Sequence, residues 1–245
     1  MERLDWQLAT VNAIRPENPT AKTFTLGLPR WRPHRAGQHY DLRLVAPDGY
    51  QAQRSYSVAS PPEKVGEIDL TVERLEDGEV SSYLHGTVVV GDRLEVRGPI
   101  GGYFVWQPEM GGPLLLVAGG SGVVPLMAML RQRRAAGSKV PATLLYSSQS
   151  PERVIYRDEL EALGRGTDGV SVVQTFTRTT PPGWKGHTRR IDRAMLDEVL
   201  RPLGPGLLAY VCGPTLLVEA AANALVLLGV PPDRIRTERF GPTGQ

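Results

Sequence analysis

The stretch PLLLVAGGSGVVPLMAML, residues 113–130, decides the fold of the second half of the chain. It opens with a continuous apolar run, which is typical of a β-strand buried on both faces of a sheet. A glycine-rich turn follows, and apolar residues then recur at helical spacing as far as an arginine-rich turn and Gly137. The stretch therefore predicts a strand, a tight turn and a helix in direct succession.

The same unit recurs towards the C-terminus. ATLLYSS leads into PERVIYRDELEALG, VSVVQTFT into IDRAMLDEVL, and LLAYVCG into PTLLVEAAANALVLLG. Strands that alternate with helices in this way are typical of a parallel sheet with helices on both faces. We therefore expect an α/β doubly wound parallel sheet over residues 112–245.

Short runs in which apolar and polar residues alternate fill the first part of the chain. They are WQLATVNAI, KTFTLGL, HYDLRLVA, RSYSVAS, EIDLTVERL and DRLEVRG, and most are separated by Gly, Pro or Asp turns. Six short strands that each bury one face predict a small antiparallel β-barrel over residues 1–107. The segment WQPEMGGP is the predicted linker between the two domains.

Composition narrows the range of functions. The formal net charge of +2 is too small an excess for the basic surface that nucleic-acid binding needs. No apolar run approaches the roughly twenty residues of a membrane helix, and the N-terminus lacks the apolar core of a secretory signal. We expect a cytoplasmic protein without integral membrane contact. The single cysteine, Cys212, excludes an internal disulfide and cannot by itself ligate a typical iron–sulfur cluster, and we expect no metal site.

The turn AGGSGVVP, Ala118–Pro125, stands where the first strand of the parallel sheet meets its helix. Gly120 and Gly122 permit a tight turn and a close approach of the backbone to a pyrophosphate, and the helix that follows offers its N-terminal amides to the anion. Pro125 holds the sixth position, so the full G-x-G-x-x-G pattern is absent. The turn favours nucleotide binding over the alternative, a plain connection between strand and helix.

The end of the second strand of this sheet bears on which nucleotide binds. An acidic residue usually meets a free 2′-hydroxyl there, whereas a 2′-phosphate needs cations. YSSQSPER supplies Ser148 and Arg153, and Arg178 follows the third strand. Hydroxyl and guanidinium groups suit a phosphate, so these residues favour NADP, with NAD as the alternative. Arg153 has a second interpretation, in which it pairs with Asp158 or Glu159 on its own helix.

Short motifs from both halves of the chain stand in a specific order. The barrel half contains Arg-x-Tyr-Ser, GEVSSYLHG and VRGPIGGYF, and the sheet half contains G-x-G-x-x-P, a CGP strand end and a terminal ERF. In this order and spacing they resemble the ferredoxin–NADP reductase family over essentially the whole chain. The chain is most similar to bacterial two-domain reductases without a fused iron–sulfur domain, an absence that the single cysteine independently requires.

The resemblance implies an FAD site on the strand RSYSVAS, residues 54–60. Arg54 would contact the FAD diphosphate, for which its permanent charge and several donors are suited. Ser55 is part of the same motif. Tyr56 would lie against the isoalloxazine ring, and Ser57 would hydrogen-bond near flavin N5. The alternatives are a surface ion pair for Arg54, a barrel core position for Tyr56 and an ordinary strand end for Ser57.

The segment GEVSSYL, residues 78–84, matches the one that opens a short helix over the same diphosphate in this family. Gly78, Val80 and Ser81 would present backbone amides to the diphosphate. Ser81 would add its hydroxyl, as anion sites at helix N-termini do. The alternative is that Ser81 is a plain N-cap.

The CGP strand end and the terminal ERF match the positions that surround the nicotinamide in this family. They are Cys212, Gly213, Pro214, Glu238 and Phe240. Phe240 would cover the second flavin face until the nicotinamide displaces it. Glu238 would orient the nicotinamide or relay a proton, and Cys212 would pack beside the hydride path, because no activating base accompanies it in the sequence. The candidate catalytic residues are therefore Ser57, Cys212 and Glu238. The tail Gly241–Gln245, which the plant enzymes lack, would block, gate or extend the nucleotide site.

The resemblance implies hydride transfer from NADPH or NADH to FAD, and then single-electron transfer to a separate acceptor protein. A ferredoxin, a flavodoxin or an oxygenase component would be such an acceptor, and we expect the reductase to be a monomer. The alternative is a stand-alone flavin or quinone reductase that acts on a small diffusible molecule. A flavin-free short-chain dehydrogenase is disfavoured because no tyrosine has a lysine four residues on. A related regulatory subunit carries an iron–sulfur cluster, which this chain cannot bind.

Overall fold

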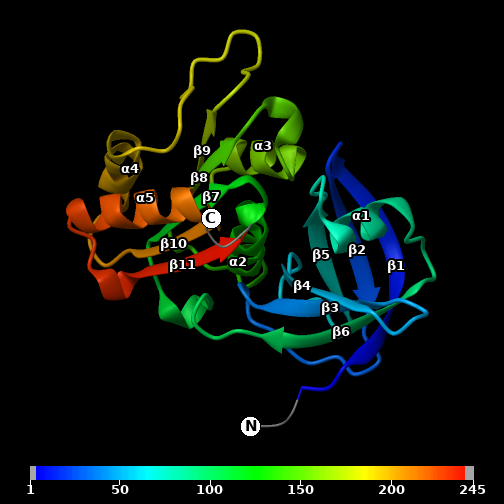
Figure 1. Ribbon diagram of the computed structural model, residues 1–245. Coiled ribbons are helices and arrows are strands. Elements are labelled where there is room, and N and C mark those ends of the chain that lie inside the picture. Colours follow the sequence, from blue (N-terminus) through cyan, green and yellow to red (C-terminus); the bar gives the residue numbers. More distant parts are fainter. Residues whose placement is uncertain (1–3, 241–245) are drawn as a thin grey trace.

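Two β-sheets of different construction lie side by side in the protein (Figure 1). The computed structural model describes residues 4–240. The first sheet is antiparallel and the second is parallel with helices around it, which confirms the fold class that the sequence predicts. The domain boundaries, 1–107 and 112–245, stay a prediction.

The first sheet forms the barrel. Its strands are β1 (Gln7–Asn18), β2 (Ala21–Gly27), β3 (His39–Val45), β4 (Gln51–Ser57), β5 (Glu67–Glu73) and β6 (Arg93–Ile100). They lie in the order β4-β3-β6-β1-β2-β5, with every neighbouring pair antiparallel. An antiparallel bridge between Val58 and Leu70 joins the end of β4 to β5, so the two edge strands meet and the sheet closes.

The alternation of apolar residues along these strands fills the barrel. Phe24 of β2 and Leu70 of β5 are among the residues buried in its core. Removing a side chain of this size from water stabilises the fold by roughly 1.5–3 kcal/mol, so the period-two pattern fixes which face of each strand is inward. The helix α1 (Glu79–Gly86) packs on the same core through Val80 and Leu84.

The second sheet has five parallel strands in the order β11-β10-β7-β8-β9. Their bounds are β7 (Leu114–Gly119), β8 (Ala142–Ser148), β9 (Val170–Phe176), β10 (Leu208–Pro214) and β11 (Ile235–Phe240). The helices are α2 (Val123–Ala135), α3 (Arg157–Arg165), α4 (Arg193–Leu200) and α5 (Thr215–Leu227). Short 3₁₀ turns are η1 (Pro108–Met110), η2 (Gly120–Gly122), η3 (Pro151–Arg153), η4 (Arg201–Leu203) and η5 (Pro232–Arg234).

Helices cover both faces of the parallel sheet (Figure 1). The central strand β7 is buried along its whole length, and its residues alternate between two cores. Leu114 and Leu116 pack with α2 and α3, whereas Leu115 and Val117 pack with α4 and α5. This double burial is the reason for the continuous apolar run in the sequence. Among residues 4–240, no helix combines the length and apolarity needed to cross a bilayer.

The structure differs from the sequence prediction in two elements of this sheet. β11 was not predicted as a strand, because the edge strand IRTERF is mostly polar and pairs with β10 alone. The predicted helix over 151–164 begins late, at Arg157. The three residues before it, Val154, Ile155 and Tyr156, are all buried. Tyr156 has a φ of 60°, a left-handed conformation that a right-handed helix excludes, so the helix cannot begin before Arg157.

The predicted linker is folded into the second half of the protein. Trp106 is fully buried, and its indole N–H donates to the Gly111 carbonyl at 2.9 Å. Its ring packs in the core beneath α2, together with Phe104. Its backbone N–H donates to the Ala36 carbonyl at 3.1 Å, so the same residue also holds a loop of the barrel half. The connection between the two sheets is therefore packed against both of them.

The arginine-rich last turn of α2 places its side chains in three different environments. Arg133 is buried, and its Nε donates to the Val140 carbonyl at 2.5 Å. Its two Nη groups reach Asp168, one at the backbone carbonyl at 2.5 Å and one at the carboxylate at 3.4 Å. Arg134 is exposed, and Arg131 faces the barrel. Arg133 therefore ties the end of α2 to the segments that lead into β8 and β9.

We predict that Arg133→Met lowers the free energy of unfolding by about 2–4 kcal/mol, because it leaves buried carbonyl groups without a donor while keeping most of the side-chain volume. Urea unfolding followed by circular dichroism measures the change. Arg134→Met is the matched control, and we expect it to change stability by less than about 0.5 kcal/mol. Equal effects of the two substitutions would contradict the structural role of Arg133.

Candidate active site

The strand order of the parallel sheet reverses between β7 and β10, which in open α/β sheets leaves a crevice at the carboxyl ends of the strands. β7 and β10 are neighbours, but α2 and α5, which follow them, lie on opposite faces of the sheet. Ligands of open α/β sheets bind at such a point, outside the carboxyl ends of the strands. The turn at residues 119–122 lies there, and a Cβ atom at Gly120 would stand 3.7 Å from Oε2 of Glu73, at the end of β5. The barrel therefore forms the other wall of this crevice.

The glycine turn is pressed against the end of β10. A Cβ atom at Gly122 would lie 2.1 Å from the Cys212 carbonyl oxygen, and one at Gly119 would lie 2.6 Å from Leu217. Gly120 has a φ of 55°, which side chains rarely adopt. α2 then begins without a side-chain cap and without an acid in its first turn, and Pro125 fits there because its missing N–H is not needed. A bare backbone and an uncapped helix N-terminus fit a phosphate.

A second uncapped helix N-terminus belongs to α1. Its N-cap residue is Gly78, which makes no side-chain cap. The predicted alternative for Ser81, a plain N-cap, is wrong: Ser81 lies inside the helix, its hydroxyl donates to the Gly78 carbonyl at 3.2 Å and accepts from the Leu75 N–H at 3.1 Å. The side chain of Val80 is buried in the barrel core. The hydroxyl of Ser81 thus shapes the loop, and the helix amides are left for an anion.

The strand β4 presents Arg54 and Tyr56 on the same face, since they are two residues apart. Arg54 is exposed, its Nη1 donates to the adjacent Gln53 carbonyl at 2.7 Å, and it makes no ion pair within residues 4–240. Tyr56 is half-buried against the barrel core, and burial raises the pKa of its hydroxyl to about 12. Ser57 ends the strand opposite His39. A cation beside an aromatic face fits the diphosphate and the ring of a flavin nucleotide.

Ser55 does not join this face. Its hydroxyl donates to Asp41 Oδ1 at 2.7 Å, and the other carboxylate oxygen of Asp41 accepts from Arg97 at 2.7 Å. This network lies on the other side of β4 from Arg54, so only the backbone of Ser55 is left for a ligand. The sequence motif includes Ser55, but its partner Asp41 is on another strand and carries no local signal.

Cys212 and Glu238 lie side by side at the ends of β10 and β11. They are paired residues of the two strands, and the Cys212 Sγ is 3.8 Å from Glu238 Oε2. Burial raises the pKa of Glu238 to about 7. Burial, and after it the charge of Glu238, raises the pKa of the Cys212 thiol well above its usual value. The thiol therefore stays protonated near neutral pH, which disfavours a nucleophilic role and suits a packing role.

The remaining predicted residues of this strand end are also close together. Phe240 pairs with Pro214 across β10 and β11 and packs on the core of the parallel sheet. A Cβ atom at Gly213 would stand 3.1 Å from the Gly119 backbone nitrogen, so the CGP strand end contacts the glycine turn directly. The tail at residues 241–245 lies outside the described residues.

Of the three residues predicted to bind a 2′-phosphate, two lie together and the third lies elsewhere. Ser148 is buried at the end of β8 and donates to the Ser150 carbonyl at 3.1 Å, and the Arg178 N–H donates to the Gln149 carbonyl at 2.9 Å, so these two lie at the same edge of the sheet. Arg153 instead donates to the Thr20 hydroxyl of the barrel at 3.1 Å. The alternative pairing of Arg153 with Asp158 or Glu159 is wrong: Arg153 makes no ion pair within residues 4–240, and Glu159 pairs with Arg131.

Two contributors to this region were not predicted. The Tyr50 hydroxyl donates to Glu79 Oε2 at 3.0 Å, which ties the start of β4 to the first turn of α1. Arg131 crosses from α2 to the barrel and donates to the Ala59 carbonyl at 2.6 Å. Both join residues far apart in the sequence, so no local pattern indicates them. The described residues contain no cluster of His, Cys, Asp or Glu suited to a metal ion.

Two nucleotide-binding halves with one crevice between them define a class of FAD- and NAD-dependent oxidoreductases, and family comparisons agree. The oxidoreductase FAD-binding domain matches residues 9–105, and the oxidoreductase NAD-binding domain matches residues 116–223. Ferredoxin–NADP reductase B of Sorangium cellulosum (strain So ce56) is 35% identical over 240 residues, which cover 95% of this chain and 96% of that protein. The chain belongs to the ferredoxin–NADP reductase family and is an FAD-dependent NAD(P)H oxidoreductase.

A second relative and a solved structure are also similar to this chain. NADH-cytochrome b5 reductase 2 of Scheffersomyces stipitis is 32% identical over 189 residues, which cover 75% of this chain and 61% of that protein. A solved ferredoxin NADP⁺ reductase from Neisseria gonorrhoeae, with bound FAD and NADP, has a TM-score of 0.80 at 23% identity, covering 96% of this chain and 98% of that one. The second likeness supports the two-domain fold, and the first shows that relatives differ in their nicotinamide and in their acceptor.

The raised pKa of Glu238 makes stability depend on pH. The folded protein keeps a proton up to about pH 7 that the unfolded chain releases near 4.5, so stability falls as pH rises through this range. We predict that Glu238→Gln becomes more stable relative to the parent by about 2 kcal/mol between pH 4.5 and pH 7.5. Urea unfolding at both pH values measures this. The same difference between Glu238→Gln and the parent at both pH values would contradict the assignment.

Proposed function

We propose that the protein carries electrons from NADPH, through bound FAD, to a separate one-electron acceptor protein such as a ferredoxin. The observation that carries this proposal is the position of two uncapped helix N-termini, those of α1 and α2. One short segment connects the two sites. At its start Glu73 lies beside Gly120 of the turn before α2, and further on the Leu75 N–H donates to the Ser81 hydroxyl in the first turn of α1. A dinucleotide and a second nucleotide both need such sites for their phosphates.

The residues of the crevice suit FAD and a nicotinamide in different ways. When bound, FAD accepts a pair of electrons from a nicotinamide and releases them singly. Arg54 and the α1 amides would hold its diphosphate, Tyr56 would lie against its ring by offset stacking, and Ser57 would hydrogen-bond to the ring edge. Cys212 and Glu238 would line the nicotinamide position, where their burial excludes water and favours a neutral environment.

The preference for NADPH over NADH rests on Arg178. It is exposed at the edge of the sheet beside Ser148, where a 2′-phosphate would lie. Arg153 gives no support in its observed position, since its guanidinium is directed to Thr20 of the barrel.

The acceptor is proposed from the electron chemistry of the relatives. Their names pair the family with ferredoxin and with cytochrome b5, and both acceptors take electrons one at a time. A flavodoxin or an oxygenase component would serve in the same way. Turnover can be measured with a ferredoxin of suitable reduction potential and compared with turnover on free flavin or quinone. The comparison separates a protein acceptor from a small diffusible one.

We predict that the purified protein is yellow and that NADPH bleaches it at lower concentration than NADH does. Arg54→Met should raise the Kd of FAD for the apoprotein by about ten- to a hundredfold, because a charge-assisted contact to the diphosphate is lost. Fluorescence titration of FAD measures this Kd, and Arg15→Met, at an exposed arginine of β1, should leave it unchanged. Protein that stays colourless after reconstitution with FAD would overturn the proposed function.

We also predict that Arg178→Gln raises the KM for NADPH by about tenfold and leaves the KM for NADH unchanged, because only NADPH carries the 2′-phosphate. Steady-state kinetics with an artificial acceptor gives both constants. Lys185→Gln, in the same exposed loop, is the control and should change neither. A parallel rise in both KM values would remove Arg178 from the specificity site.

A further inference from the structure

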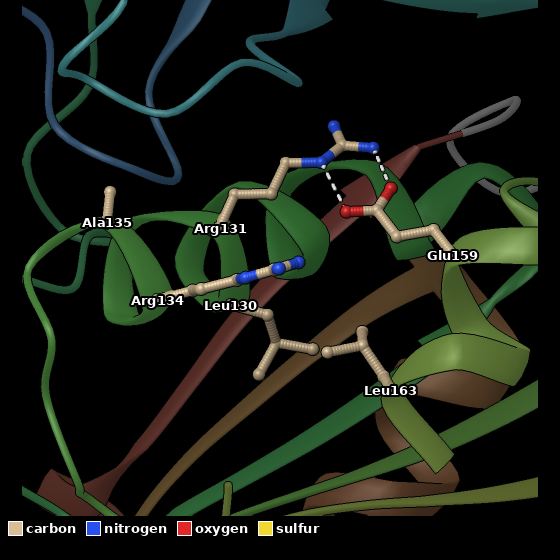
Figure 2. Close-up of a pocket in the computed structure, with 6 residues that line it drawn as sticks. All are labelled: Leu130, Arg131, Arg134, Ala135, Glu159 and Leu163. Atoms are coloured by element: carbon tan, nitrogen blue, oxygen red, sulfur yellow. Dashed lines mark hydrogen bonds and ion pairs between the residues drawn. The ribbon is translucent and has the colours of Figure 1, made fainter. Parts of the chain in front are cut away.

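A polar contact between the barrel and the parallel sheet lies along α2 and α3, away from the glycine turn. Its residues are Arg131 of α2, Tyr156 immediately before α3, and Glu159 of α3. Figure 2 shows Arg131 and Glu159 directed toward one another across a cleft whose floor is formed by Leu130 and Leu163. The guanidinium and carboxylate make two parallel hydrogen bonds, of 3.0 Å at Nε and 2.5 Å at Nη2.

The remaining Nη1 of Arg131 binds the barrel. It donates to the Ala59 carbonyl at 2.6 Å, while the Ala59 N–H donates to the Asp69 carbonyl of β5 at 2.8 Å. Ala59 stands two residues after Ser57, where the bridge from Val58 closes β4 onto β5. Arg131 therefore holds the backbone that continues directly from the proposed flavin strand.

Tyr156 provides the second hold on the barrel. Its ring is buried under the guanidinium of Arg131, whose Cζ lies 4.4 Å from the ring centre. Its hydroxyl is 2.5 Å from the Thr71 hydroxyl of β5, which is in turn 2.7 Å from the Thr23 hydroxyl of β2. Tyr156 has a φ of 60°, and within residues 4–240 it is the one non-glycine residue with a positive φ. Such a conformation is unfavourable for a bulky residue and persists where surrounding contacts impose it.

The helix α2 links this contact to the nucleotide turn. Arg131 lies nine residues after Gly122, roughly 13 Å along a helix that rises 1.5 Å per residue. One end of α2 thus carries the glycine turn of the nicotinamide half, and the other end holds the segment that follows the flavin strand. Because the helix is rigid, a shift at Arg131 moves the turn relative to β4.

A separate contact on the linker side keeps the halves together without Arg131. The Tyr210 hydroxyl donates to the Val105 carbonyl at 2.8 Å, Arg236 donates to the same carbonyl at 2.7 Å, and Tyr103 donates to the Ile235 carbonyl at 3.1 Å. Arg153 also stays bonded to the barrel, through Asn18 at 3.1 Å and Thr20 at 3.1 Å. Loss of the Arg131 contact would therefore leave a folded protein whose halves are still joined but less firmly aligned.

We infer that Arg131, Tyr156 and Glu159 form a positioning clamp that sets the spacing between the flavin strand and the nicotinamide site. The inference rests on the proposed function, because the spacing matters only if the two rings must meet. The clamp residues touch neither proposed ring, so they act by holding β4 and α2 in register. Small errors in such alignment slow a reaction strongly, by up to about a hundredfold for about 1 Å.

The test uses the FAD-loaded protein with Arg131→Met, Tyr156→Phe and the matched control Arg134→Met, since Arg134 is exposed and lines the same cleft (Figure 2). We expect Arg131→Met to slow bleaching by NADPH in stopped-flow absorbance by about tenfold or more, with the half-saturating NADPH concentration changed less than about threefold. Tyr156→Phe should slow it less, Arg131→Lys should fall between parent and Arg131→Met, and Arg134→Met should match the parent.

Hydrogen exchange of the peptides around residues 57–60 and 154–160 gives a readout that needs no electron transfer. Faster exchange at both peptides in Arg131→Met, with no change in Arg134→Met, supports the clamp. Parental bleaching and exchange in Arg131→Met, or equal losses in Arg134→Met, would overturn it; if Arg131→Met fails to fold, Tyr156→Phe decides by the same criteria. A parent protein that binds no FAD refutes the proposed function instead, and the exchange result then still decides whether the contact is a clamp.

Discussion

The contact between the glycine turn and the backbone of β10 is the constraint on which the rest of the site depends. A single methyl group at Gly122 would overlap the Cys212 carbonyl, so the turn can pass only as bare backbone. This approach sends α2 to one face of the sheet while α5 covers the other, which opens the crevice. It also brings Cys212, and Glu238 beside it, close to the place where the barrel approaches the turn through Glu73.

The barrel and the sheet reach this crevice through two seams of different character. The seam on the linker side uses backbone carbonyls of residues that adjoin the connection. The seam along α2 uses a charged pair and a tyrosine in an unfavourable backbone conformation. Two ring systems that exchange a hydride must lie face to face at contact distance. If only one seam joined the two halves, the halves could rotate and the rings would lose this alignment. Both seams together define the relative orientation of the halves.

Local patterns in the sequence predict the sheets and most of the candidate site, whereas contacts between distant residues escape them. The apolar run of β7 reports burial on both faces, and the glycine turn and RSYS motif are contiguous. β11 was missed because an edge strand needs little apolar character. The pairing of Ser55 with Asp41, and of Arg131 with Ala59, depends on which strands and helices become neighbours. A sequence motif specifies residue types, whereas the fold determines in which direction each side chain points.

The burial of Trp106 limits how the two halves can be exchanged between proteins. Trp106 and Phe104 precede the parallel sheet in the chain, yet their rings complete its core. A gene fusion that joined a foreign barrel directly before Leu114 would remove both rings and leave a cavity beneath α2. A fusion that keeps both rings with the parallel sheet must therefore join the chain upstream of Phe104, within the predicted barrel domain.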